Sequence, residues 1–375
     1  MHGEPIRALR LRLRRWLAVT RLETLHLIHD PPTLALIVLV PAVQILLFGY
    51  AVNLDPRNVP IVIAREEAAP EGALRRAIAD TGYFRVLADG LAPGEAARMV
   101  RRHEALIGIE LPPAGDPDDA VTGAMSPRAI IDATDPAAVR PAALALEAAL
   151  WRHLAPGQQS GRAVPVRVEW LYNPEGRTTW AVAPALAGVI VMVTMLLLGA
   201  LTLVRERERG TWESLLVTPV SGVDAMVGKL APYVFLGVAQ AAIVLLVAYA
   251  LFGLPVRGPV VALLLAAALL ALAHLLTGFA VSALARTQVQ AIQAVVFFYL
   301  PSMLLSGFMF PFSGMPSWAQ VLGEALPLTH FVRAARGVLL RGDAGAAVAI
   351  EMWPVAAFTC LVTGLAAIAY RRRLE

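Results

Sequence analysis

Cysteine, lysine and charge are all scarce in this sequence. The one cysteine, Cys360, lies in an apolar run, which excludes an intramolecular disulfide and a cysteine-based zinc site. Charged residues make up 16% of the 375 residues, hydrophobic residues make up 58%, and the mean hydropathy is +0.64. Soluble domains are roughly 45–50% apolar. The composition therefore predicts a polytopic membrane protein.

The motifs of nucleotide hydrolysis and of common hydrolases are missing as well. The pair Gly228-Lys229 lacks the upstream glycine and the following Ser or Thr of a phosphate-binding loop, so we expect no ATP hydrolysis by this chain. The sequence has no nucleophile elbow and no His-Glu-x-x-His zinc motif. The pI is 9.6, but the sequence has no basic stripe interleaved with aromatic residues, so it does not indicate nucleic-acid binding. We expect neither a catalytic site nor a directly bound cofactor.

Candidate metal ligands are few and badly spaced. Asp116, Asp118 and Asp119 lack the loop glycine and terminal glutamate of a calcium loop, so they are better explained as a solvated acidic loop. His103 and His153 are isolated from each other and from any cysteine, and we expect a surface or capping role for them.

Six apolar runs are long enough to span a membrane. Arginine clusters lie at the N-terminus, at residues 205–209, at Arg286 and at residues 371–373, and the positive-inside rule places all four, with both termini, in the cytoplasm. We expect the first run to be a retained anchor, because no small-residue cleavage site follows it before Asn53. The predicted spans are Thr33–Tyr50, Ala181–Val204, Ala231–Phe252, Val260–Leu284, Ala291–Phe310 and Trp353–Tyr370.

The spans divide the chain into four parts. Residues 1–30 alternate arginines with Leu and Trp, which predicts an amphipathic connecting helix on the cytoplasmic leaflet. Residues 31–52 hold the first span, residues 53–178 hold none, and residues 179–375 hold the other five. The predicted fold is an α-helical polytopic membrane protein. It has six transmembrane helices and a mixed α/β extracytoplasmic domain inserted between the first and second spans.

Within residues 53–178, strand-like and helix-like segments alternate. The sequence Asp132-Ala133-Thr134-Asp135-Pro136 predicts a turn and a helix cap. Residues 112–127 are rich in Pro, Gly and Asp and predict a flexible loop. We expect strands at Val59–Ala64, Tyr83–Leu87, Leu106–Leu111, Ala129–Asp132 and Val164–Tyr172, and helices at Glu71–Thr81, Gly94–His103 and Pro136–Leu154.

Three polar residues, Gln240, His274 and Gln293, fall inside predicted spans. Polar side chains at this depth face a protein interface or a water-filled path far more often than lipid. These residues therefore either hydrogen-bond between helices, which we favour, or line a transport path.

Residues 204–229 form a charged segment between two apolar runs, which predicts a cytoplasmic loop. Within it, Thr211–Val217 predicts a short amphipathic helix that Pro219 and Gly222 end. Such a loop suits receiving a push from a soluble partner, and it also suits an ordinary loop with a positive-inside signal.

Residues 311–351 are too broken by Pro and Gly for a span. We expect an external re-entrant segment of short helices. Its arginines Arg333, Arg336 and Arg341 violate the positive-inside count unless they contact lipid headgroups or the acidic external domain.

Several stretches resemble signatures of ABC type-2 export permeases, the membrane subunits of ATP-driven exporters. They are RERERGTWESLLVTP, the following GK and Pro232-Tyr233, and the Leu-Ser-Gly-Phe, Met-Pro-x-Trp and Pro-Leu-Thr-His-Phe runs after residue 300. Two motifs depart from the family pattern, with Ala133 and Ala185 where glycine is usual. The loss of glycine at 185 argues against a close helix crossing there.

The resemblance implies that the Thr211–Val217 helix docks on an ATPase subunit that binds ATP and Mg²⁺. It also implies a dimer with a second permease copy or paralogue in the bacterial inner membrane, and some similar pumps use a periplasmic adaptor. The residues expected to couple to the ATPase are Glu206, Arg207, Glu208, Arg209, Gly210, Thr211, Trp212, Glu213, Leu215, Pro219 and Lys229.

By the same resemblance, the exported substrate is hydrophobic or amphipathic, either drug-like or lipid-like. The rival class is an ion-gradient-driven secondary transporter, which usually shows internal repeats and acidic residues at mid-membrane. We find no repeat, and no Asp or Glu in the six predicted spans. A membrane enzyme or a scaffold ranks third.

Overall fold

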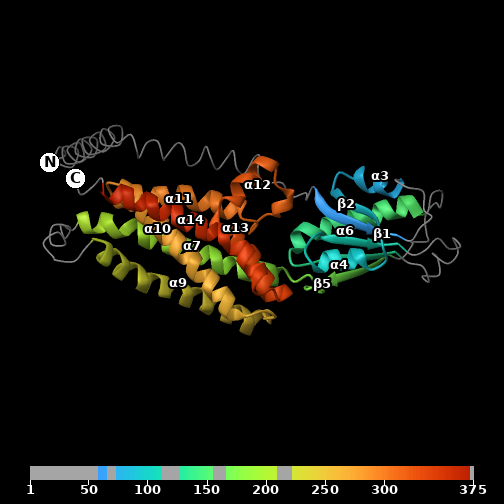
Figure 1. The fold of residues 1–375 in the computed structure, drawn as a ribbon, viewed down its shortest axis with the longest axis horizontal. Coiled ribbons are helices and arrows are strands. Elements are labelled where there is room, and N and C mark those ends of the chain that lie inside the picture. Colours follow the sequence, from blue (N-terminus) through green and yellow to red (C-terminus); the bar gives the residue numbers. More distant parts are fainter. Residues whose placement is uncertain (1–57, 66–72, 112–126, 155–165, 209–221, 372–375) are drawn as a thin grey trace, which may run out of the picture.

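The computed structural model describes residues 58–65, 73–111, 127–154, 166–208 and 222–371. Figure 1 shows two parts along the long axis of the molecule: a sheet with its helices at one end, and a set of long helices at the other. The predicted connecting helix at 1–30 and the predicted first span at Thr33–Tyr50 lie outside the described residues, as does most of the loop predicted at 112–127.

The α/β part is a five-stranded sheet in the order β2-β1-β3-β4-β5. β1 runs parallel to β2 and β3, β3 and β4 are antiparallel, and β4 and β5 are parallel. The strands are β1 Val59–Ala64, β2 Phe84–Leu91, β3 Ile107–Glu110, β4 Arg128–Asp132 and β5 Arg167–Leu171, and the helices are α3 Ala73–Ala79, α4 Glu95–Arg101 and α6 Pro136–Leu154.

Apolar side chains on alternate positions of the strands form two cores. Ile61 and Ile63 of β1 pack with side chains of α3 and α6, whereas Val62 and Ala64 pack with side chains of α4. Because successive strand residues point to opposite faces, a central strand covered on both sides reads as a continuous apolar run. Each strand and helix predicted in this region overlaps one in the structure.

Five of the described helices are long and apolar enough to cross a membrane. Their candidate spans are Thr178–Thr202 of α7 (Thr178–Glu208), Leu230–Phe252 of α9 (Gly222–Phe252), Val260–Leu284 of α10 (the whole helix), Gln288–Leu305 of α11 (the whole helix) and Ala346–Ala366 of α14 (Ala346–Arg371).

Helices α7 and α10 form the closest pair of the bundle. A Cβ built on Gly199 of α7 would lie 2.3 Å from the carbonyl oxygen of Leu275, and one built on Gly278 of α10 would lie 2.3 Å from that of Leu196. Small residues at such crossings let two membrane helices approach backbone to backbone. The close approach is therefore at Gly199 and Gly278, while Ala185 lies buried in a neighbouring apolar cluster.

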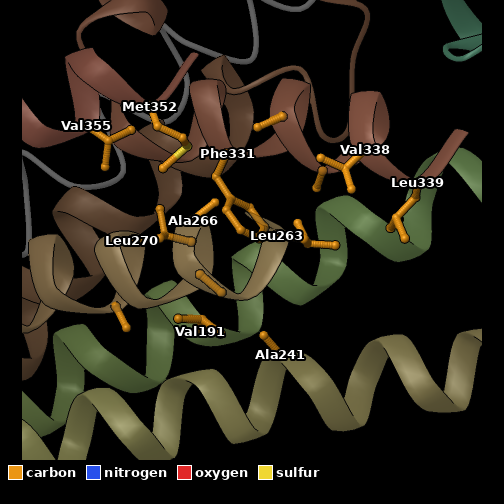
Figure 2. Close-up of a cluster of buried hydrophobic side chains, with 14 of the residues drawn as sticks. Val191, Ala241, Leu263, Ala266, Leu270, Phe331, Val338, Leu339, Met352 and Val355 are labelled. Atoms are coloured by element: carbon orange, nitrogen blue, oxygen red, sulfur yellow. The ribbon is translucent and has the colours of Figure 1, made fainter. Parts of the chain in front are cut away.

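Short helices connect α11 to α14 along the chain. Figure 2 shows Phe331 of α13 inserted among Leu263, Ala266 and Leu270 of α10. The Phe331 ring is fully buried, and it occupies the room that Gly188 of α7 leaves by having no side chain. The elements here are the 3₁₀ turn η2 Phe312–Gly314, α12 Ser317–Glu324, α13 Pro327–Arg336 and the π-helical turn η3 Gly337–Arg341.

Two predicted boundaries in this half are wrong. Helix α11 ends at Leu305 and not at Phe310, because the chain turns at Gly307, whose φ of 78° suits glycine. Helix α14 begins at Ala346 and not at Trp353, following Gly345 with φ 54°. Residues 346–351, predicted as the end of the re-entrant segment, therefore belong to α14.

Candidate functional site

The charged segment predicted as a loop over 204–229 is helical at both of its ends. Helix α7 continues through Glu208, and α9 begins at Gly222. At the end of α7 the prediction is wrong because Arg and Glu are good helix formers and no glycine or proline interrupts them before Gly210. Only residues 209–221 lie between the two described helices.

Among the residues predicted to couple to an ATPase, Glu208 is the one whose side chain the structure describes. Glu206 and Arg207 lie in the last turn of α7, and Lys229 lies in α9. Contact of all these residues with an ATPase stays a prediction. Those outside the described residues are Arg209, Gly210, Thr211, Trp212, Glu213, Leu215 and Pro219.

The Glu208 carboxylate lies at the start of α11. Its Oε1 accepts a hydrogen bond from the backbone N–H of Gln288 at 3.0 Å, and its Oε2 accepts one from the Gln288 side-chain amide. These two hydrogen bonds lower the pKa of Glu208, so the side chain is an anion at neutral pH. An anion at the first backbone donor of a helix satisfies a group that has no partner within the helix.

The turn between α10 and α11 is closed by its own polar side chains as well. Thr287 Oγ1 accepts from the backbone N–H of Gln290 at 3.3 Å, and Gln290 Oε1 accepts from the backbone N–H of Arg286 at 3.0 Å. The Thr287 side chain caps the helix as its N-cap residue, and Gln290 reaches back one residue further, to Arg286. These hydrogen bonds tie the first turn of α11 to the preceding residues where Glu208 meets it.

The three polar residues inside the spans have different surroundings. Gln240 Nε2 of α9 donates to Thr194 Oγ1 of α7 at 3.1 Å, which is a hydrogen bond between helices. His274 is fully buried, with Nδ1 donating to the Leu270 carbonyl at 2.9 Å and its ring against Phe298. Gln240 Oε1, His274 Nε2 and Gln293 Oε1 are buried with no hydrogen-bond partner among the described residues. A path-lining role for them stays a prediction.

A second group of charges lies where the sheet meets the long helices, and we call it the junction cluster: His103, Asp132, Arg341 and Asp343. His103 Nδ1 lies 3.6 Å from Asp132 Oδ2, and His103 Nε2 lies 3.4 Å from Asp343 Oδ1. Arg341 Nη2 lies 2.8 Å from Asp343 Oδ2, and Arg341 Nη1 lies 4.0 Å from Asp132 Oδ2. The cluster joins α/β residues to the end of η3.

The charges of the junction cluster stabilise one another. The contact with Asp132, and then that with Asp343, raises the pKa of His103 above its ordinary 6.5, although burial and Arg341 oppose this shift. Burial alone would raise the pKa of Asp343, but hydrogen bonds from His103 and Arg341 outweigh it and hold that pKa at about 2. Because both imidazole nitrogens face carboxylates, the charged form satisfies the ring best.

The turn that carries Asp132 also carries a second link to the helices. Asp132 Oδ1 accepts from the Thr134 backbone N–H at 3.0 Å, which confirms the predicted turn. The next acid, Asp135, accepts from Arg336 Nη1 at 3.0 Å. The Arg336 guanidinium also donates to the Ala181 carbonyl at 3.1 Å and to the Gly307 carbonyl at 3.3 Å. One buried arginine thus joins the sheet, α7 and the chain after α11.

The third arginine of this segment pairs within the helices. Arg333 Nη1 donates to Glu324 Oε2 at 3.0 Å and lies 4.0 Å from Glu351 Oε2. His330 Nδ1 lies 3.2 Å from Glu351 Oε2. Glu351 lies within the candidate span of α14, so the expectation of no acidic residue in a span is wrong, because α14 starts earlier than predicted.

Sequence reasoning indicated a contact for the arginines but none for the histidine. Arg336 and Arg341 contact acids of the α/β part. Such contact was one of the two explanations offered for arginines in an external segment. The expected surface position of His103 is confirmed, because the residue is exposed. Its side chain also lies between two carboxylates from distant segments, which the sequence did not indicate. The acidic turn at 132–135 was the sequence feature that could have indicated these contacts. Among the described residues, no group of three metal-ligating side chains occurs.

The helices, the apolar spans and the attached α/β part define a polytopic membrane protein. The chain belongs to the ABC-2 family transporter proteins, whose family model matches residues 32–369. It is 28% identical over 365 residues to the probable multidrug ABC transporter permease YbhR of Escherichia coli strain K12, covering 96% of this chain and 98% of that one.

Two further relatives come from the same strain. The probable multidrug ABC transporter permease YbhS is 27% identical over 373 residues, with 96% of this chain and 98% of YbhS covered. The inner membrane transport permease YhhJ is 33% identical over 182 residues, which cover 48% of each chain.

Proposed function

We propose that this chain is the transmembrane permease subunit of an ATP-driven ABC exporter in a bacterial inner membrane. The observation that carries this conclusion is the family match over residues 32–369, together with five apolar helices, of which α7 and α9 lie on either side of a charged segment. The proposed topology adds Thr33–Tyr50 as a sixth span, with both termini in the cytoplasm and the α/β part outside.

In this proposal the energy comes from a separate ATPase, because the sequence has no phosphate-binding loop. The ATPase binds ATP and Mg²⁺ and closes, and its movement pushes the segment between α7 and α9. Glu206, Arg207, Arg209 and Glu213 supply polar contacts to it, while Trp212 and Leu215 transmit the push by packing.

The proposed assembly holds two permeases, either two copies or this chain with a paralogue, and two ATPases. Relatives that align over nearly their full length carry the word multidrug in their names. We therefore propose export of drug-like or lipid-like amphipathic compounds from the cytoplasm or the inner leaflet. A periplasmic adaptor bound to the α/β part belongs to the same proposal.

The test is purification of the tagged protein from its native membrane, with the co-purified proteins identified by mass spectrometry. We expect a P-loop ATPase with the parent chain and none with the double variant Trp212→Ala, Glu213→Arg. Glu104→Arg is the matched control, because it makes the same charge change at an exposed position of the α/β part. It is expected to retain the ATPase.

One result would contradict the proposed function. A folded parent chain that brings no ATPase, with transport that survives ATP depletion and follows an ion gradient, would assign the protein to the secondary transporters instead.

A further inference from the structure

The contact between Glu208 and Gln288 joins two helices that are distant in sequence. Glu208 is the last residue of α7, Gln288 is the first residue of α11, and the whole of α9 and α10 lies between them along the chain. The carboxylate meets Gln288 at two points, the backbone N–H and the side-chain amide. A two-point contact fixes both the distance and the orientation between the helix ends.

Glu208 lies next to the segment on which the proposed ATPase acts. Residues 209–221 begin immediately after it, so any displacement of that segment acts directly on the end of α7. The other end of the contact is the first turn of α11, which the Thr287 cap and the hydrogen bond from Arg286 to Gln290 tie to the preceding turn. Two helix ends joined at two points by hydrogen bonds are expected to move together.

The far end of α11 leads toward the junction with the α/β part. The chain after α11 includes Gly307, whose carbonyl accepts from Arg336, and the same arginine bonds Asp135 of the acidic turn. Side chains of α7, α11 and α13 also share one apolar cluster. A displacement of α11 therefore reaches the residues that hold the sheet on the helices.

We propose that Glu208 is a positioning residue that transmits movement of the 209–221 segment to α11, through its bonds to Gln288. This inference rests on the proposed function, since it needs an ATPase to move the segment. It assigns to Glu208 a role inside the permease, in place of the contact with the ATPase that the family resemblance implies.

The chain offers variants that break the contact from either side. Glu208→Ala removes the acceptor. Gln288→Pro removes both donors yet preserves the helix, because proline is tolerated at the first helical position. Thr287 before it is already extended, at φ −129° and ψ 158°, as a residue preceding proline requires. Glu208→Gln keeps a hydrogen-bond acceptor, and Arg205→Ala changes an exposed residue one turn earlier on α7.

The readout is the environment of a fluorophore attached beyond the far end of α11. In a Cys360→Ser background, the exposed Met309 is changed to cysteine and labelled with an environment-sensitive dye. The permease–ATPase complex in nanodiscs is then trapped with ATP, Mg²⁺ and vanadate. Co-purified ATPase and ATP hydrolysis are measured on each sample.

We expect the parent, Arg205→Ala and Glu208→Gln to show the trapped-state signal. Glu208→Ala and Gln288→Pro should each reduce it by about five-fold or more, the lower end of the range for coupling between two sites, with the ATPase still bound. The double variant should be no worse than either single variant, because both remove the same interaction.

Two outcomes overturn the inference. A full signal in Glu208→Ala shows that the contact transmits nothing. A loss in Glu208→Ala with a full signal in Gln288→Pro shows that Glu208 acts on another partner. If the parent complex contains no ATPase, the proposed function fails instead, and that result is separate from both.

Discussion

At the scale of single residues, the junction depends on charges that come from both parts of the molecule. His103 and Asp132 belong to the α/β part, and Arg341 and Asp343 lie at the end of η3. Tyr172, whose ring centroid is 6.1 Å from that of His103, lies beside them. The pKa of Asp343 is held at about 2, whereas that of His103 is raised from its ordinary value of 6.5.

The raised pKa of His103 makes the junction pH-dependent. A histidine whose pKa is higher in the folded state contributes stability that is fully present below its ordinary value of 6.5 and is lost as the pH rises through the raised value. We expect hydrogen exchange at residues 337–345, corrected for the intrinsic rate, to be slower at pH 6 than at about pH 9.

The control for this prediction is His103→Gln, which keeps a polar side chain that does not titrate. Its protection at residues 337–345 should be low and equal at the two pH values. Equal protection in the parent chain at both pH values would contradict a role for the charged imidazole.

At the scale of helices, the α7–α10 crossing is the contact whose disruption we expect to destabilise the bundle. Gly199 and Gly278 let the two backbones meet, and even a methyl group at either position would lie within 2.3 Å of a carbonyl oxygen of the facing helix. A backbone atom cannot turn aside as a side chain can, so the helices must separate. Such overpacking costs about 1–3 kcal/mol.

We therefore expect Gly199→Ala and Gly278→Ala each to destabilise the protein by about 2 kcal/mol. The measurement is thermal unfolding in detergent followed by size-exclusion chromatography. Gly364→Ala in α14 is the matched control, since a Cβ there meets no atom within 4 Å. Equal losses at Gly364 and Gly199 would show that helix propensity or handling, and not the crossing, sets stability.

Elements also show where local sequence stops being informative. The helix starts at Pro136 and Val260 were predicted correctly, because proline and the preceding turn mark them. The end of α11 and the start of α14 were missed by several residues. Glycines 307 and 345 set those ends through positive φ, and an apolar run alone does not show where its helix stops.

At the scale of the whole molecule, the proposed topology makes a direct prediction about accessibility. In a Cys360→Ser background, single cysteines replace the exposed Leu144 on α6 and the exposed Arg286 between α10 and α11. In intact spheroplasts, a membrane-impermeant maleimide should label position 144 and spare position 286. Inverted vesicles should show the reverse pattern.

Each position serves as the control for the other, because both side chains are exposed. Labelling of position 286 from outside, with position 144 protected, would invert the topology. It would also move the charged segment between α7 and α9 away from any cytoplasmic ATPase.

The sequence by itself determined the membrane class, five of the spans that the structure describes, and the order of strands and helices in the α/β part. These features are local: an apolar run of sufficient length must leave water, and strand and helix periods repeat every few residues. The family could be named from contiguous motifs for the same reason.

Only the tertiary structure decided which charges meet. Asp135 and Arg336 are far apart in the sequence, as are Glu208 and Gln288, and each pair meets because helices bring its members together. Arg333, Arg336 and Arg341 look alike in sequence, yet one pairs within the helices and two reach the α/β part. Long-range pairing follows from packing, and packing depends on such details as the two glycines that let α7 and α10 touch.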